Sequence, residues 1–125
     1  MAKVIFSDAD RESFLRIKEC VKDIVDHTKN MTEEKWHDED VQYVLKDALV
    51  KLVEAYLNAT DVVKQFMREY FADIDCIIHY CIDGLDGMSP DSDNYDKTKE
   101  EPDFVFFYII KYLPLSLQKM NGVTI

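Results

Sequence analysis

Apolar residues recur every three or four positions along most of the chain, a pattern that predicts amphipathic helices. The first apolar stretch follows Ser7-Asp8-Ala9-Asp10, a sequence typical of a capping box at the start of a helix. We expect this first helix to end near Asn30. Its apolar positions fall on one stripe: Phe14, Ile17, Val21, Ile24 and Thr28.

A second helix is predicted from Thr32, which is a suitable N-cap and is followed by two glutamates. A wide apolar face then runs from Val41 to Tyr56. The sequence Asn58-Ala59-Thr60-Asp61 offers side-chain hydrogen bonds that compete with the helical ladder. We therefore predict a break there with Asn58 or Thr60 as the next cap, while a single bent helix is the alternative.

The third predicted helix follows this break and stops at Gly84, a residue type that favours helix ends. Turn-forming residues dominate 85–101, which predicts a long acidic loop. Pro102-Asp103 suits the start of a fourth helix. The run from Phe104 to Ile110 is compatible with a buried strand or a helix, and we favour the helix because no second long strand is available to pair with it. Pro114 is expected to kink or end that helix.

These elements predict an all-α fold. The chain has 125 residues, of which 47% are hydrophobic, and this is enough for one compact core. We expect residues 1–125 to form a single domain, a bundle of about four helices with the acidic loop between the third and the fourth. The sequence does not indicate an oligomeric state.

The charge narrows the possible partners. There are 25 acidic and 15 basic side chains, a formal net charge of −10, so direct binding to the phosphates of nucleic acids is disfavoured. No apolar run approaches the roughly 20 residues that cross a bilayer as a helix, and the N-terminal sequence does not resemble a signal peptide. Three cysteines cannot all pair within one chain, which favours a reducing compartment. We therefore expect a cytoplasmic protein with no membrane partner.

Catalytic motifs are missing from the sequence. The three glycines, Gly84, Gly87 and Gly122, match neither the dinucleotide fingerprint nor the phosphate-binding loop. No G-x-S-x-G sequence is present either. We accordingly expect a protein that is not an enzyme and that needs no cofactor.

One cluster nevertheless resembles a metal site. On a helix, Asp75, His79 and Asp83 share one face because they are four residues apart, and Cys76 flanks that face. A structural zinc site normally has four ligands, and no second pair of Cys or His completes this one. A helical-bundle metal-binding protein is therefore the less favoured alternative.

Acidic residues gather in two places that we predict to bind a partner. The first is the loop after the third helix, where Tyr95 is the aromatic anchor. The second lies beside Trp36, and Tyr43 and Tyr80 are further aromatic candidates near acids. The predicted binding residues are Asp91, Asp93, Tyr95, Asp96, Glu100 and Glu101 in the loop and Asp38, Glu39 and Asp40 in the second patch.

The function that these features favour is masking of a basic site on another protein, as immunity proteins, antitoxins and phage-type inhibitors do. The partner would be a toxin or a nucleic-acid-binding protein. The alternative is a nucleic-acid mimic, in which carboxylates replace phosphates. Mimicry predicts one continuous exposed ridge formed by six acids: Asp38, Asp40, Asp47, Glu54, Asp61 and Asp73.

Overall fold

The computed structural model describes residues 5–29, 38–88 and 103–123, and for Glu39, Gln42, Tyr80, 83–88 and 103–110 it describes the backbone alone. Within these ranges the chain is all helical and contains no strand. The helices are α1 (Asp8–Thr28), α3 (Glu39–Leu57), α4 (Asp61–Tyr70), α5 (Ala72–Met88) and α6 (Asp103–Asn121). The predicted all-α bundle is confirmed.

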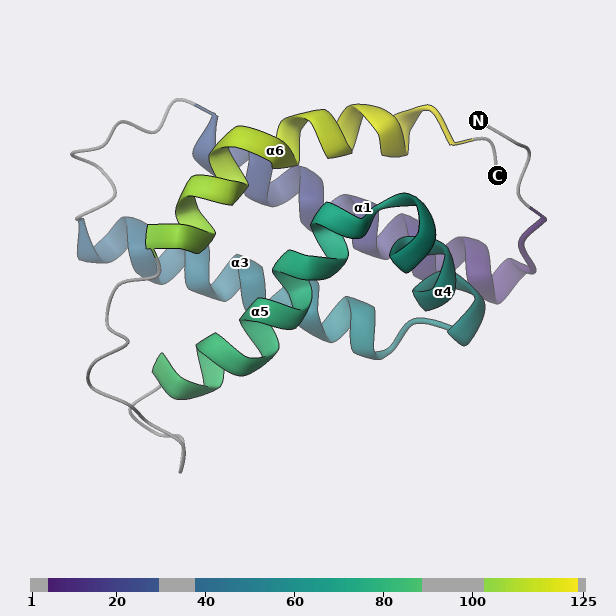
Figure 1. Ribbon diagram of the computed structural model, residues 1–125, viewed down its shortest axis with the longest axis horizontal. Helices are drawn as coiled ribbons and strands as arrows, with labels where there is room; N and C mark the ends of the chain where they lie inside the picture. The colour runs from purple at the N-terminus through teal and green to yellow at the C-terminus, as the bar shows by residue number, and fades with distance from the viewer. Residues whose placement is uncertain (1–4, 30–37, 89–102, 124–125) are drawn as a thin grey trace.

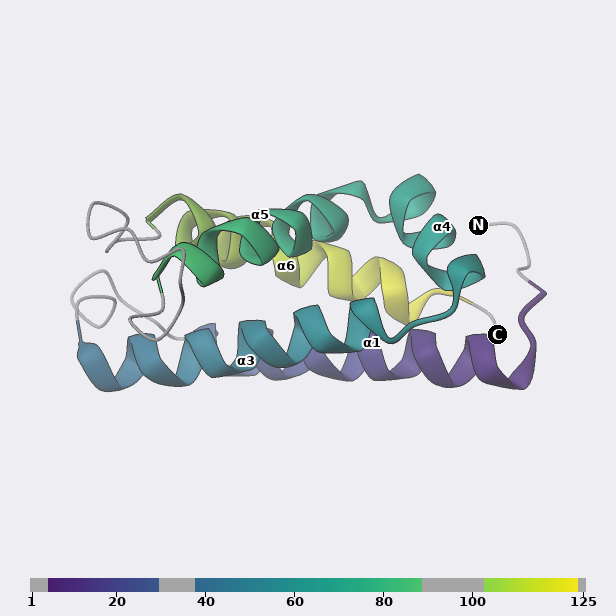
Figure 2. The same ribbon diagram turned by 90° about the horizontal axis from the view of Figure 1, so that it is seen from below.

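The helices are arranged in two layers. Figure 2 shows α1 and α3 side by side in one layer, with α4, α5 and α6 in the other. The long helices α1 and α3 run in opposite directions, and α5 crosses over α3 (Figure 1). Contacts link α1 to α3 and α6, and α5 to α3 and α6, so these four helices close a ring around the core. No described helix covers the faces of α1 and α3 that point away from the second layer.

Side-chain caps fix where the helices begin. Ser7 Oγ accepts from the Asp10 amide at 3.1 Å while Asp10 Oδ2 accepts from the Ser7 amide at 3.0 Å, which completes the predicted capping box. Thr60 Oγ1 accepts from the Val63 amide at 3.3 Å and caps α4. The break predicted between Asn58 and Asp61 is therefore confirmed.

The core lies between the two layers and is aliphatic along most of its length. Ile17, Val21 and Ile24 of α1 meet Leu45, Leu49 and Leu52 of α3, and all six are almost fully buried. Aromatic rings close the end near α4, where Phe66 packs edge-on against both Phe6 and Phe14. The same layer of side chains thus holds α1 and α3 against the helices above them.

The predicted third helix is divided in two. Phe71 leaves the helical conformation, with φ −132° and ψ 50°, and separates α4 from α5. Its ring is buried and lies 5.7 Å from that of Phe66 and 6.3 Å from that of Phe14. Packing of Phe71 into the aromatic cluster accounts for the break, because the sequence there contains neither Gly nor Pro.

The end of this helix also differs from the prediction. Gly84 does not stop it, since α5 continues to Met88 with no glycine at positive φ among the described residues. Residues 85–88, the first four of the predicted loop, are therefore helical. The helix predicted from Thr32 instead begins at Glu39, with Asp38 as its N-cap, and Thr32 itself lies outside the described residues, as do residues 89–102.

The helix predicted over Phe104 to Ile110 is present as the first part of α6. Pro114 does not end it, and α6 continues to Asn121. A proline inside a helix removes one backbone hydrogen bond and favours a kink. Figure 1 shows the axis of α6 turning between its first and second halves, in keeping with the predicted kink.

Candidate functional site

The open face of the α1–α3 layer carries two rows of carboxylates, which we call the acidic rows. One row lies on α1 and the other on α3, and each repeats every seven residues, so its members share one face of the helix at intervals of roughly 10 Å. All six side chains are exposed: Glu12, Glu19 and Asp26 on α1, and Asp40, Asp47 and Glu54 on α3. The buried stripes of the two helices point the opposite way, into the core.

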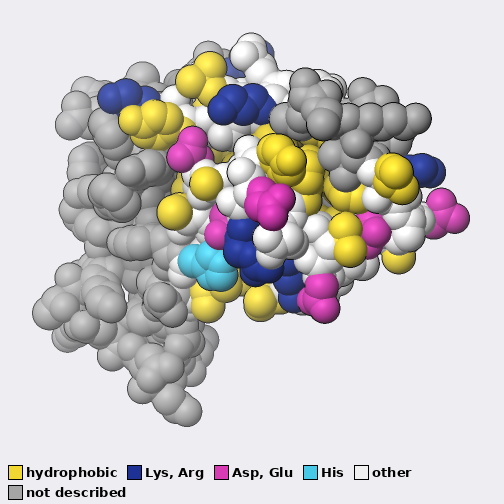
Figure 3. Space-filling view, turned by 45° about the vertical axis from the view of Figure 1, so that its right-hand side comes forward, with side chains coloured by type: hydrophobic (Ala, Val, Ile, Leu, Met, Phe, Trp, Pro, Cys, Tyr) yellow, Lys and Arg dark blue, Asp and Glu magenta, His cyan; other side chains and the backbone are white. Residues whose placement is uncertain are grey.

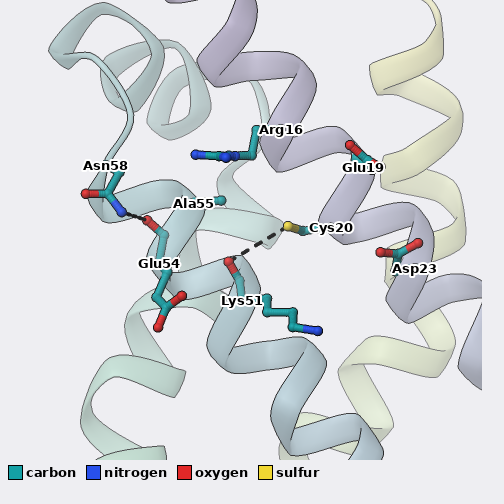
Figure 4. A pocket seen from close by; sticks show the side chains of 8 residues that line it. All are labelled: Arg16, Glu19, Cys20, Asp23, Lys51, Glu54, Ala55 and Asn58. Carbon is teal, nitrogen blue, oxygen red and sulfur yellow. Dashed lines mark hydrogen bonds between the residues drawn. The ribbon is translucent and has the colours of Figure 1, made fainter.

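A groove lies between the two helices, and we call it the α1–α3 groove. Its main part has a volume of about 320 Å³, and Figure 4 shows its walls and Cys20 between them. A second hollow of about 260 Å³ shares Arg16, Ala55 and Asn58 with the first and extends it toward the start of α1. The charged residues that line the two parts are Glu12, Arg16, Glu19, Asp23, Lys51 and Glu54.

The carboxylates that line the groove have no counter-ion among the described residues. Glu19, Asp23 and Glu54 form no ion pair in the described part of the chain. Lys51, one of the two cations of the groove, is already paired with Asp47 at 3.2 Å. The groove therefore holds more negative charge than its own cations neutralise, and a cationic group from outside can pair with it.

The pKa of the Cys20 thiol is affected by the charged side chains that line the groove. Cys20 is half-buried, and its Sγ lies 3.8 Å from the Lys51 carbonyl oxygen. Burial raises the pKa of this thiol above its ordinary value, and the carboxylates of Asp23 and Glu19 raise it further. They act more strongly on the thiol than Arg16 and Lys51, which lower the pKa. The two carboxylates thus outweigh the two cations at the floor of the groove.

The sequence prediction missed the α1 half of this face. Residues 8–28 contain six acids and four bases, so composition alone did not mark α1, and the predicted binding residues lie in the loop and at Asp38 to Asp40. The seven-residue spacing of Glu12, Glu19 and Asp26 was the available signal, because it places three acids on one face of the helix. The groove itself depends on how α1 packs against α3, which a sequence pattern does not show.

The predicted binding residues divide between described and undescribed parts of the chain. Every loop candidate lies outside the described residues, and so does the side chain of Glu39. Asp38 is the N-cap of α3, where its Oδ1 accepts from the Asp40 amide at 2.9 Å. Asp40 is exposed and begins the acidic row of α3. The loop candidates are Asp91, Asp93, Tyr95, Asp96, Glu100 and Glu101.

The ridge expected of a nucleic-acid mimic is only partly assembled. All six acids are exposed, and Asp40, Asp47 and Glu54 do lie in one row. Asp61 and Asp73, however, belong to α4 and α5, helices of the other layer (Figure 2). The six do not therefore follow a single helix face.

The metal-like cluster is reduced to a pair of side chains. His79 Nε2 lies 3.5 Å from Asp75 Oδ1, while Cys76 is exposed and the side chain of Asp83 lies outside the described residues. Within the described residues, no three His, Cys, Asp or Glu side chains converge in a way that could hold a metal ion. Two ligands fall short of the four that a structural zinc site uses.

The Asp75–His79 pair belongs to a second charged region, which we call the Tyr56 cluster. The His79 ring packs edge-on against Tyr56 at 5.6 Å, and Lys64 Nζ lies 5.9 Å from the centre of the Tyr56 ring. Burial raises the pKa of Tyr56 above its ordinary value, and the neighbouring Asp75 raises it further. Figure 3 shows the side that carries α4 and α5, where Lys and Arg side chains lie beside a histidine with acids nearby.

Comparisons with known proteins found no match to this chain among family models, curated proteins or solved structures. Among the described helices, none combines the length and the apolar character needed to cross a membrane. The site must therefore be interpreted from its own geometry, in which unpaired carboxylates from two helices line one open groove.

Proposed function

We propose that this protein is a non-enzymatic binding protein whose α1–α3 face masks a basic site on a partner protein. One observation carries the proposal: Glu19, Asp23 and Glu54 line a groove and pair with no cation in the described part of the chain. An arginine or lysine side chain that enters the groove meets carboxylates from both walls. Charge-assisted hydrogen bonds of this kind are roughly twice as strong as neutral ones.

The arrangement suits protein binding for a second reason. The acidic rows extend along two antiparallel helices beyond the groove itself, from Glu12 to Asp26 and from Asp40 to Glu54. A negative field of this extent speeds the encounter with a basic partner and is screened by salt. The partner we propose is a toxin or a nucleic-acid-binding protein that presents a basic surface, as for immunity proteins, antitoxins and phage-type inhibitors.

Nucleic-acid mimicry is a narrower form of the same proposal, and we rank it second. Duplex DNA carries about one negative charge per 1.7 Å of its axis. Each acidic row instead repeats at roughly 10 Å, and Arg16 and Lys51 lie between the two rows. The wide spacing of the carboxylates and the two cations between the rows make this face a better match for a few basic side chains of a protein than for a complete phosphate-binding channel.

The proposed setting is the cytoplasm. All three cysteines, Cys20, Cys76 and Cys81, are free thiols. Free thiols persist in reducing compartments, where disulfides are rare. We further propose that the protein works without a metal or other cofactor, since its binding rests on charged side chains and on a groove formed by two helices.

The experiment that tests this proposal reverses charge in the groove. The probe is a synthetic arginine-rich peptide, and the same peptide with citrulline in place of arginine supplies a neutral control. We expect the double variant Glu19→Lys with Asp23→Lys to bind the arginine peptide roughly five- to thirtyfold more weakly, since exposed ion pairs contribute up to about 1 kcal/mol each. Binding of the wild type should weaken as salt rises and should be lost with citrulline.

The matched control reverses two exposed acids of the other layer, Glu69→Lys with Asp73→Lys. It changes the net charge by the same amount but leaves the groove intact. Equal losses in the two double variants would mean that net charge, and not the groove, binds the peptide. The proposal would then be wrong about the site.

A further inference from the structure

Exposed apolar side chains lie beside the acidic row of α3, and they form what we call the apolar strip: Tyr43, Val50 and Leu57. They are 75%, 41% and 54% exposed, and they recur every seven residues on the outward side of the helix. At 1.5 Å per residue, the strip is roughly 20 Å long. The acids Asp47 and Glu54 each follow a strip residue by four positions, so the acidic row borders the strip along its length.

Single exposed apolar residues are common on protein surfaces and need no explanation. A seven-residue repeat on one helix is different, because it presents a continuous seam to which a second helix can pack. Each strip residue is large, and the only aromatic member, Tyr43, is the most exposed of the three. Tyrosine is among the residues that contribute most at protein interfaces.

The charge beside the strip identifies what covers it. A helix that lies along α3 places its own flanking residues against Asp40, Asp47 and Glu54, so basic flanks are the complement. The undescribed segments of this chain do not supply such a helix. Residues 30–37 contain two acids and one lysine, and residues 89–102 contain five acids and two lysines.

A second copy of the chain is also a poorer complement. In an antiparallel pair of α3 helices, the acidic row of each copy faces the acidic row of the other. In a parallel pair, the row faces the opposite flank of α3, where Lys46 is the one cation. One lysine cannot neutralise the three acids of the row.

We infer that the outward face of α3 binds an amphipathic helix of the partner, with apolar side chains on the strip and Lys or Arg against the acidic row. The inference rests on the proposed function for its charge and adds the helical, amphipathic form of the partner. The helix lies along α3, while cationic side chains from its flank reach the α1–α3 groove. Recognition of an amphipathic helix by an apolar surface is a common binding mode.

The test uses a synthetic amphipathic peptide with leucine at every seventh position and lysine along one flank. Two control peptides keep the composition: one carries the lysines on the opposite flank, and one is scrambled so that no apolar seam remains. We expect the designed peptide to gain helicity, measured by circular dichroism, on binding the wild type. The scrambled peptide should gain none.

The decisive variant is Val50→Gln with Leu57→Gln, which removes apolar surface at exposed positions without touching the core. We expect it to bind the designed peptide about tenfold more weakly or worse, because a buried Val or Leu side chain contributes strongly to association. The matched control is Val62→Gln with Leu115→Gln, two exposed apolar residues on α4 and α6 that are 52% and 58% exposed. This control should bind as the wild type does.

The outcomes separate this inference from the proposed function. If Val50→Gln with Leu57→Gln binds normally while Glu19→Lys with Asp23→Lys does not, the helical partner is wrong and the acidic groove stands. If the strip variant fails while the groove variant and high salt have no effect, charge masking is wrong. If the wild type sediments as a dimer and the strip variant as a monomer, the strip is an interface between two copies and the inference is overturned.

Discussion

The α1–α3 groove and the Tyr56 cluster both bring charged side chains together, but they use them differently. In the groove, the four lining carboxylates, Glu12, Glu19, Asp23 and Glu54, form no ion pair in the described part of the chain. Along α4, next to the Tyr56 cluster, charges meet local partners: Arg68 donates to Gln65 at 2.9 Å, and Gln65 donates to Glu69 at 2.7 Å. Within the cluster, His79 Nε2 lies 3.5 Å from Asp75 Oδ1, a buried atom that has no hydrogen-bond partner among the described residues. Charge that is satisfied internally stabilises the fold, whereas unpaired charge is available to a partner.

The first prediction tests whether both regions depend on one core. Leu52 is a completely buried residue of α3, the helix that contacts both α1 and α5. We expect Leu52→Ala to lower the free energy of unfolding by about 2 to 5 kcal/mol through lost burial and a residual cavity. Urea denaturation followed by circular dichroism measures the loss. An unchanged midpoint would show that the two layers do not share this core.

A smaller effect is expected at the junction between the groove and the second layer. Thr60 caps α4, so Thr60→Ala should cost about 1 kcal/mol of stability. The same hydroxyl, followed by the backbone of Ser7, holds the pKa of Asp10 below its ordinary value of 3.8. A lowered pKa stabilises the fold above that value, and the benefit is lost as the pH falls below it. The stability gap between Thr60→Ala and the wild type should therefore narrow in acid.

The Tyr56 cluster should reveal itself at high pH. Because the pKa of Tyr56 in the folded state is raised above 10.0, the phenol ionises more easily in the unfolded chain. Its stabilising contribution is complete below pH 10.0 and is lost as the pH rises through the folded value. We expect Tyr56→Phe to lose stability less steeply above that pH than the wild type does. Identical slopes in alkaline denaturation would refute the assignment.

The smallest expected effect is a difference in chemical reactivity among the three thiols, which differ in exposure. Cys76 is exposed, Cys20 is half-buried with a raised pKa, and Cys81 is 2% exposed with its pKa raised by burial to about 12. Since the thiolate is the reactive form, we expect a neutral thiol reagent to modify them in that order at neutral pH. Mass spectrometry after short exposures gives the rates. Faster labelling at Cys81 than at Cys20 would contradict this order.

Local signals explain which elements were predictable. Ser7 and Thr60 cap their helices through hydrogen bonds to residues three positions later, so these caps could be predicted from the local sequence. Phe71 breaks a helical pattern because distant rings hold it, and Gly84 stays helical although its type favours an end. At Phe71, tertiary packing overrode the local preference.

The candidate site was less predictable than the fold for the same reason. Acid content indicated a basic partner, but it placed the site in the loop and at Asp38 to Asp40. The groove requires two helices that are far apart in the sequence to lie antiparallel, so that Arg16 and Asn58 line one hollow. Composition reports the sign of a surface, while the arrangement of helices decides where unpaired charge collects.

The most direct test of the groove is to map amide chemical shifts by NMR while the arginine-rich peptide is added, with the citrulline peptide as the control. The largest shifts should fall on α1 from Arg16 to Asp23 and on α3 from Lys51 to Asn58, with α4 and the first half of α5 nearly unchanged. The citrulline peptide should shift neither region. Shifts concentrated around Tyr56 and His79, or in residues 89–102, would contradict the assignment of the groove as the binding site.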